Sequence, residues 1–192
     1  MCGLLKRAKI ELRGKKVLIL GSGGTSKTAF AVATHLGASE VLVVSRHPDG
    51  KQIDYEAAVR DHADAQVIIN TTPAGMYPKN EGCPIDIELF PSLVGVIDAI
   101  YNPHRTNLIT QAQKRGIAAE GGLYMLVSQA VRACEYFTGK EIPDSRCDEV
   151  YSKILFGKEN IILVGMPGCG KSTVGKMIAE KLSRPFIDAD DY

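Results

Sequence analysis

Residues 16–28 read KVLILGSGGTSKT, an apolar run followed by a glycine-rich turn and a polar segment. The run Val17–Leu20 predicts a short buried strand, and the residues after the turn predict a helix that Gly37 ends. A turn between a strand and a helix is a common place for phosphate groups, because the free N–H groups and the positive end of the helix at Thr25–Thr28 favour anions. The stretch therefore predicts an α/β fold with a dinucleotide site at the turn.

Two glycines and one serine of this turn bear on what it holds. Gly21 permits a tight turn, and Gly23 lets the backbone approach a phosphate closely. The G-x-G-x-x-G pattern of dinucleotide sites is incomplete, because its third position is Ser26. An ordinary glycine-rich turn remains the alternative interpretation.

The rest of the chain continues the alternation of strands and helices. Up to about residue 139 this alternation indicates a Rossmann-like, doubly wound parallel sheet. The clearest helix is Leu123–Phe137, whose apolar residues recur at helical spacing. Further strands are predicted at Val41–Ser45, Gln66–Asn70 and Val94–Ile100, and further helices at Asp54–His62 and Thr106–Arg115.

The βα pattern begins again near the end of the chain. Residues 140–159 are charged and irregular apart from a short predicted helix at 150–155, and we interpret them as a linker. The elements predicted after it are a strand at Ile161–Val164, a helix at Lys171–Leu182 and the start of a strand at Phe186-Ile187. The predicted parts are a Rossmann-like domain at 1–139, a linker at 140–159 and an incomplete β-α-β fragment at 160–192.

Composition and charge argue against several classes of protein. The 192 residues carry a net charge of +1, which does not favour bulk electrostatic capture of nucleic acid or of a membrane. No apolar run reaches the roughly 18 residues of a transmembrane helix, and the first residues lack the features of a signal peptide. The five cysteines and four histidines show no metal spacing, so we expect free thiols in the cytoplasm and no zinc or iron site. The composition leaves the oligomeric state open.

The end of the second predicted strand carries a cofactor signal. Folds that bind NAD place Asp or Glu there to bond the ribose 2′-hydroxyl, whereas this strand ends in Ser45-Arg46-His47. An arginine at that place makes a charge-assisted contact with a 2′-phosphate. The sequence therefore predicts NADP rather than NAD, with Arg46 as the discriminating residue. A solvated surface arginine is the alternative.

Five blocks occur in order along residues 4–139: GKKVLILGSGGTSKTA, VVSRHP, INTTPAGMYP, IDAIYNPHRTNLI and EGGLYMLVSQA. Together they resemble the cofactor domain of the shikimate dehydrogenase family. The resemblance implies the reduction of 3-dehydroshikimate to shikimate with NADPH. A quinate dehydrogenase with a similar cofactor domain remains an alternative.

The resemblance also implies a role for particular residues. Those implied to contact NADP are Gly21, Ser22, Gly23, Gly24 and Thr25 at the pyrophosphate, Ser45 and Arg46 at the adenosine phosphate, Asn70, Thr71, Thr72, Pro73 and Met76 beside the cofactor, and Ala99 and Gly122 on the nicotinamide side. Those implied to contact the substrate are Tyr101 and Gln129. A side-chain amide at Gln129 both donates and accepts hydrogen bonds, although a surface glutamine is the alternative.

The chain departs from the family pattern at two positions and in one larger respect. Tyr124 replaces a small residue, and Thr71 replaces the alanine of Asn-Ala-Thr. The family's acid/base Lys and Asp belong to an N-terminal substrate domain that would precede Met1, so no catalytic residue is assigned in this chain. Positioned acid/base groups contribute roughly 10²–10⁴-fold to a rate. We therefore expect this chain to bind NADP but to reduce 3-dehydroshikimate negligibly.

A second phosphate loop lies at residues 165–173, which read GMPGCGKST. It is a complete G-x4-G-K-[ST] sequence between a predicted strand and a predicted helix, which is a specific signal. The expected roles are a backbone cradle for ATP phosphates at Gly168, Cys169 and Gly170, contact with the β/γ oxygens by Lys171, Mg²⁺ ligation by Ser172 and an α-phosphate contact by Thr173.

The segment SRPFIDADDY at 183–192, together with this loop, resembles the start of shikimate kinase. By that resemblance Asp190 binds shikimate hydroxyls and Asp188 lies near the Mg²⁺, whereas a solvated acidic turn is the alternative. The chain thus resembles the middle of a bifunctional shikimate dehydrogenase/shikimate kinase. Units below about 40 residues seldom fold alone, so we expect no kinase activity. A stand-alone NADP-binding module or partner subunit is the competing interpretation.

Overall fold

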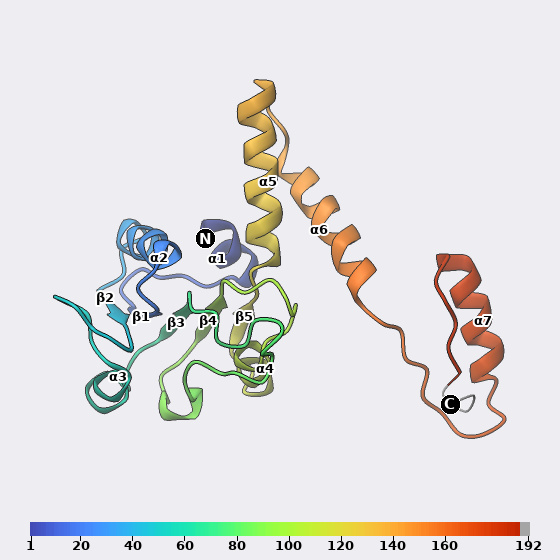
Figure 1. The fold of residues 1–192 in the computed structure, drawn as a ribbon, viewed down its shortest axis with the longest axis horizontal. Helices are drawn as coiled ribbons and strands as arrows, with labels where there is room; N and C mark the ends of the chain where they lie inside the picture. Colours follow the sequence, from blue (N-terminus) through green and yellow to red (C-terminus); the bar gives the residue numbers. More distant parts are fainter. Residues whose placement is uncertain (189–192) are drawn as a thin grey trace. The chain divides into compact units, whose positions relative to one another are not determined.

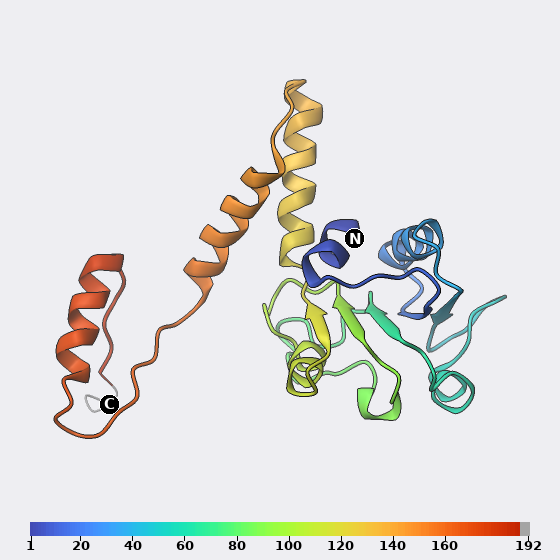
Figure 2. The ribbon, with the colours of Figure 1, turned by 180° about the vertical axis from the view of Figure 1, so that it is seen from behind.

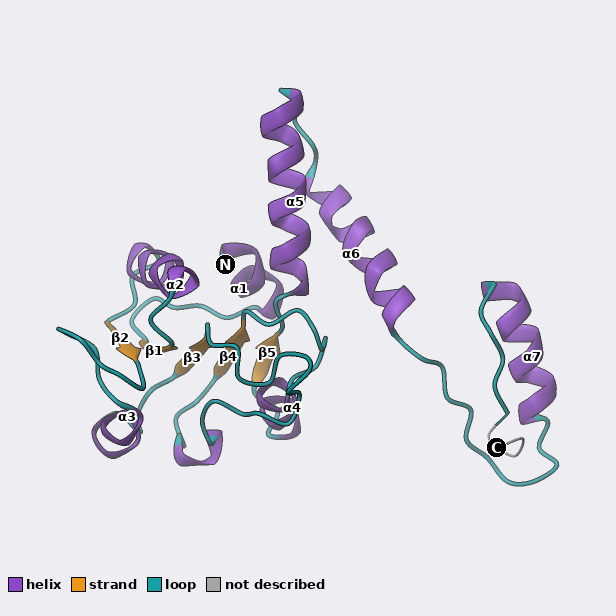
Figure 3. Cartoon of the chain, in the orientation of Figure 1, coloured by secondary structure: helices purple, strands orange, loops and turns teal. Residues whose placement is uncertain are grey.

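The computed structural model describes residues 1–188, and the chain divides into two compact units, Met1–Ser152 and the residues from Lys153 onward. The first unit contains a five-stranded sheet in the order β2-β1-β3-β4-β5, with every neighbouring pair parallel (Figures 1 and 3). Its strands are β1 (Lys16–Leu20), β2 (Glu40–Val44), β3 (Val67–Asn70), β4 (Gly95–Asp98) and β5 (Ala118–Glu120). The predicted Rossmann-like α/β fold is confirmed.

Helices cover both faces of this sheet (Figures 1 and 2). One face carries α1 (Cys2–Ala8), α2 (Gly24–His35) and the start of α5 (Leu123–Thr138), and the other carries α3 (Tyr55–Asp61), the 3-10 helix η1 (Ile87–Leu89) and α4 (Asn107–Lys114). No helix among residues 1–188 is long and apolar enough to cross a membrane.

The central strands are buried on both sides. In β1, Val17 and Ile19 join the cluster beneath α1 and α2, whereas Leu18 and Leu20 join the cluster beneath α3 and α4. Successive side chains of a strand point to opposite faces, so a strand between two helical layers must be apolar throughout. This requirement explains the unbroken apolar run with which the sequence begins its first strand.

The strand order creates the place for a ligand. The chain leaves β1 for β2 on one side and later returns to β3 on the other side, by way of α2 and α3 on opposite faces. β1 and β3 are neighbours, and from their carboxyl ends the chain runs to opposite sides of the sheet: from β1 to β2 over one face, and from β3 to β4 over the other. Ligands of open α/β sheets bind beside such a switch point. The glycine-rich turn after β1 lies at this point.

Three elements of the first unit had no counterpart in the sequence prediction: α1, η1 and β5. The strand β5 has the sequence AAE, which carries no β-branched or aromatic residue. It is a strand because β4 lies beside it and supplies its backbone partners. Tertiary pairing, rather than local preference, produces this element.

The expectation of an irregular segment with only a short helix at 150–155 was wrong. A single helix, α6, spans Asp144–Lys158. Its first half packs within the first unit, where Tyr151 is 3% exposed and its ring lies edge-on to Tyr124 with 5.5 Å between centroids. The guanidinium of Arg7 lies 4.1 Å from the centre of the Tyr151 ring. Few apolar residues of α6 make these contacts, so the helical periodicity of apolar residues in its sequence is weak. The proposed linker boundaries, 140 and 159, stay a prediction.

In the second unit, the helix predicted at 171–182 is confirmed as α7 (Lys171–Leu182). The strands predicted at 161–164 and 186–187 were wrong, because both segments are drawn as loop (Figure 3). A strand needs a neighbour for its backbone hydrogen bonds, and the described residues of this unit form no ladder. Both segments nevertheless pack on α7, where a Cβ at Gly175 would lie 2.5 Å from the Phe186 ring and 3.4 Å from Leu163.

Candidate functional site

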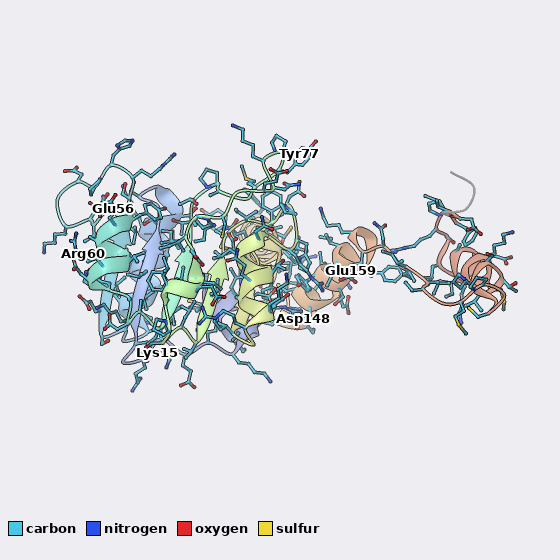
Figure 4. The ribbon with its side chains drawn as sticks, turned by 90° about the horizontal axis from the view of Figure 1, so that it is seen from below. Lys15, Glu56, Arg60, Tyr77, Asp148 and Glu159 are labelled. Carbon is cyan, nitrogen blue, oxygen red and sulfur yellow. The ribbon has the colours of Figure 1, made fainter. Side chains whose placement is uncertain are left out.

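The predicted cofactor residues gather at one edge of the sheet. Figure 4 shows the two edges, with Lys15 just before β1 at one end and Tyr77, in the loop after β3, at the other. The residues that follow the carboxyl ends of the strands are Gly21–Thr25 after β1, Ser45 and Arg46 after β2, Thr71–Met76 after β3, and Ala99 and Tyr101 after β4. Parallel strands thus bring four separate sequence blocks to the same edge.

The turn after β1 is held between the ends of its two neighbours. Gly21 has a φ of 101° and donates its N–H to the carbonyl of Val44 at 2.8 Å. The hydroxyl of Thr71 donates to the carbonyl of Leu20 at 2.6 Å. A Cβ at Gly21 would lie 2.9 Å from that hydroxyl oxygen, so both the conformation and the space require glycine.

The outer side of the turn is open. A Cβ at Gly23 or at Gly24 would meet no atom within 4 Å, and no side chain caps the start of α2. Ser26, at the third position of the glycine pattern, is 3% exposed, so a small side chain there satisfies the close packing of helix on sheet. Exposed N–H groups at a helix start with free space before them fit a pyrophosphate.

The end of β2 presents a serine and an arginine. The hydroxyl of Ser45 is 3.5 Å from that of Ser22, and it also accepts from the N–H of His47 at 3.2 Å. Arg46 is exposed. Burial raises the pKa of the Tyr55 phenol, and the positive charge of Arg46 opposes this shift. The arginine therefore lies within electrostatic reach of the start of α3, and its contact with a 2′-phosphate stays a prediction.

Ala99 and Gly122, both expected beside the nicotinamide, are in contact. A Cβ at Gly122 would lie 2.1 Å from the carbonyl oxygen of Ala99, and the Gly122 N–H donates to the carbonyl of Ile100 at 2.8 Å. Tyr101 is 46% exposed in the same loop. Gln129 is exposed on α5, roughly 10 Å further along the helix axis from Gly122. The structure thus joins the two backbone positions and places Gln129 apart from them.

A buried polar network beneath this edge was missed by the sequence reasoning. The carboxylate of Asp98 accepts hydrogen bonds from the Asn70 amide at 3.0 Å, the Ile100 N–H at 3.0 Å and the Thr106 hydroxyl at 2.7 Å. Burial raises the pKa of Asp98, and the three hydrogen bonds oppose the shift. The sequence feature that could have revealed the network is Asp98, an acidic residue at the end of the otherwise apolar strand β4.

The second phosphate loop has a conformation suited to anions. Gly168 and Gly170 have φ values of 77° and 83°, on either side of Cys169, and no side chain caps the start of α7. Alternation of this kind turns successive N–H groups toward one side. The ammonium of Lys171 donates to the carbonyls of Gly165 and Met166, each at 2.9 Å. Thr173 lies in the first turn of α7.

The two predicted Mg²⁺ ligands lie together. The hydroxyl of Ser172 donates to the carboxylate of Asp188 at 2.9 Å, across 16 residues of sequence. Magnesium prefers oxygen ligands and keeps several waters, so a hydroxyl and one carboxylate suit it. Asp190, the predicted shikimate contact, lies outside the described residues.

A concavity between the end of α5 and the start of α6 contains none of the predicted site residues. Its lining includes Arg132, Glu135 and Asp144. Arg132 already pairs with Glu135 at 2.7 Å and with Asp144 at 2.8 Å. Because these charged side chains already form ion pairs with one another, the carboxyl edge of the sheet remains the candidate site.

Comparisons with known proteins agree with this geometry. The NADP(+)-dependent shikimate dehydrogenase of Methanosphaera stadtmanae is 35% identical over 148 residues, which cover 68% of this chain and 52% of that protein. Most of the chain is homologous to shikimate dehydrogenases. It spans about half the length of the curated relatives it matches.

Solved dehydrogenase structures share the fold. Shikimate dehydrogenase 1 from Peptoclostridium difficile has 31% identity and a TM-score of 0.75, over 83% of this chain and 61% of that one. A chorismate mutase/shikimate 5-dehydrogenase fusion from Clostridium acetobutylicum has 30% identity and a TM-score of 0.77, with the same two coverages. Residues 167–192 match a family model described as shikimate kinase. The chain therefore joins dehydrogenase homology to a short kinase segment.

Proposed function

We propose that the first unit is the NADP-binding part of a shikimate dehydrogenase, which reduces 3-dehydroshikimate to shikimate. The observation that carries the proposal is the open turn Gly21–Thr25 at the switch point of the sheet, with Arg46 at the end of the next strand. The relatives that bear the name NADP(+)-dependent shikimate dehydrogenase support the choice of cofactor and substrate.

Different residues bind different parts of the cofactor. N–H groups at the start of α2 bind the pyrophosphate, and Arg46 binds the 2′-phosphate as an ion pair. Loops at 71–76 and 99–101, together with Gly122, orient the nicotinamide end. Tyr101, in the second of these loops, contacts the substrate, and so does Gln129 from its place further along α5. NADPH supplies the hydride when it is bound. Asp98 is buried and engaged by three donors, so it does not exchange a proton with the substrate.

For the second unit, we propose that the loop at 165–173 binds the phosphates of Mg-ATP as the first part of a shikimate kinase module. The Ser172–Asp188 hydrogen bond and the match to the kinase family support this role. An intact protein with both modules would make shikimate and then phosphorylate it.

Titration with NADPH, followed by nicotinamide fluorescence and with NADH alongside, tests the cofactor proposal. We expect saturable binding of NADPH that is at least about tenfold tighter than that of NADH, because one charge-assisted contact contributes about 1.5–3 kcal/mol. Equal affinities would contradict the proposed role of Arg46, and the absence of binding would contradict the site itself.

We further propose that residues 1–192 alone turn over neither substrate. NADPH oxidation with 3-dehydroshikimate and phosphate transfer from ATP to shikimate should both stay within about tenfold of the uncatalysed rate. Acid/base and substrate-positioning groups raise reaction rates by much more than this, and no acid/base residue is assigned in residues 1–192. Product chromatography separates true turnover from cofactor decay. If residues 1–192 transfer phosphate to shikimate and a Lys171→Ala variant does not, the proposed inactivity of the kinase segment is contradicted. If residues 1–192 form shikimate from 3-dehydroshikimate, the proposed inactivity of the dehydrogenase unit is contradicted.

A further inference from the structure

Asp98 is a charged group in an unusual place. It ends β4, is 0% exposed and lies among apolar strands. All three of its partners, the Asn70 amide, the Ile100 N–H and the Thr106 hydroxyl, act as donors to it. An ionised carboxylate acts only as an acceptor, so three donors suit the charged form of Asp98. Burial raises the pKa of Asp98, and the three donors oppose that shift by stabilising the charged form.

The first partner connects this charge to the loop after β3. Asn70 donates its amide N–H to Asp98, which directs its amide oxygen toward Thr72. That oxygen accepts from the Thr72 N–H at 2.9 Å and from the Thr72 hydroxyl at 2.7 Å. The Thr72 hydroxyl in turn accepts from the N–H of Ala74 at 3.3 Å. A flipped amide would put its NH₂ against the Thr72 N–H, so Asp98 selects the orientation that holds the loop.

The other two partners connect the same charge to the loop after β4. Ile100, between Ala99 and Tyr101, donates its N–H to Asp98, and its carbonyl accepts from Gly122 at the start of α5. Thr106 donates its hydroxyl to Asp98 and accepts from the N–H of Ile109, which caps α4. One carboxylate thus fixes both ends of the loop 99–106.

We infer that Asp98 is the positioning residue of the cofactor edge, because it holds the loops 71–76 and 99–106 in the geometry that receives the nicotinamide end. The inference rests on the proposed function of that edge. Asp98 itself does not contact the cofactor, since its side chain is buried. Mobile loops would have to become ordered on binding, and that ordering lowers affinity.

Three variants separate positioning from simple stability. In Asp98→Asn the remaining oxygen accepts from Asn70 and Ile100, while the new NH₂ meets the Thr106 hydroxyl, which also accepts. In Asp98→Ala all three donors are left without their acceptor. Ile97→Ala, at the neighbouring buried residue of β4, removes apolar packing and leaves the network intact. Melting temperatures establish how far Ile97→Ala matches the stability loss of Asp98→Ala.

The first measurement is amide hydrogen exchange without cofactor. We expect Asp98→Ala to speed the exchange of Thr72 and Ile100 by at least about tenfold relative to Ile97→Ala, and Asp98→Asn to stay within about threefold of the original chain. The second is NADPH affinity by fluorescence, with a loss of about tenfold or more for Asp98→Ala and of less than about threefold for the other two. Equal exchange and equal affinity in Asp98→Ala and Ile97→Ala would overturn the inference.

If Asp98→Ala does not fold, the variant Thr106→Val tests the same inference. It removes one donor, so the inference predicts faster exchange at Ile100 and Thr72, whereas a role limited to capping α4 would loosen only the residues from Asn107 onward. If the original chain binds no NADPH, the proposed function fails, and hydrogen exchange still decides whether Asp98 orders the two loops.

Discussion

Replacing Arg46 with aspartate is expected to weaken NADPH binding about 100-fold without weakening NADH binding. The variant loses a charge-assisted contact with the 2′-phosphate, worth about 1.5–3 kcal/mol, and places a negative charge where the phosphate binds. An aspartate at this position instead accepts a hydrogen bond from the 2′-hydroxyl of NADH. Fluorescence titration of both cofactors against the original chain and the variant measures the change.

Lys51→Asp is the matched control for this experiment. Lys51 is exposed in the same connection between β2 and α3, so its replacement makes the same change in net charge. If Lys51→Asp weakens NADPH binding as much as Arg46→Asp does, the effect is a general one of surface charge. Unchanged cofactor preference in Arg46→Asp would refute the assignment of this residue.

Gly122→Ala is expected to destabilise the first unit by about 3 kcal/mol, at the upper end of the range for overpacked sites. The added Cβ would lie 2.1 Å from the Ala99 carbonyl oxygen and 3.0 Å from the carbonyl carbon of Ile100. Both obstacles are backbone atoms, so relief requires α5 to move away from the end of β4. We also expect weaker NADPH binding, because the displaced segments border the nicotinamide end. Chemical denaturation measures the stability and fluorescence titration the binding.

Gly157→Ala provides the comparison. Gly157 lies in α6 and a Cβ there would meet no atom within 4 Å. Alanine is preferred over glycine inside a helix by about 0.5–1 kcal/mol. Because Gly157 belongs to the second unit, this variant should leave the stability of the first unit unchanged. A stable, NADPH-binding Gly122→Ala protein would show that the approach of α5 to β4 is less tight than the structure has it.

The first strand, its turn and its helix were predictable because each follows from short-range chemistry. Four apolar residues in a row suit a strand buried on both faces, and Gly21 adopts a backbone conformation that other residues rarely adopt. The gathering of the candidate site residues at four strand ends could also be predicted, since the carboxyl ends of parallel strands lie at one edge of the sheet. Ser26 illustrates the limit of a pattern: the motif asks for glycine, whereas the structure requires only a small side chain.

What escaped prediction depends on partners distant in the sequence. The donors that stabilise Asp98 come from β3, from the loop after β4 and from the start of α4. The first half of α6 is stabilised by Arg7 and Tyr124, more than twenty residues away in each case. Conversely, residues 161–164 have the composition of a strand and lack a neighbouring strand among the described residues. Tyr124, which departs from the family pattern, contacts Tyr151 of α6.

NADP binding at the carboxyl edge of the sheet is tested most directly by titrating the isotope-labelled chain with NADP⁺ and following ¹H–¹⁵N spectra residue by residue. We predict saturable shifts confined to the carboxyl edge, at Gly21–Thr25, Ser45-Arg46, the loop 71–76, Ala99 and Gly122, with the amides of 165–173 unchanged. Shifts that cluster at 165–173 instead, or none at the glycine-rich turn after β1, would contradict it.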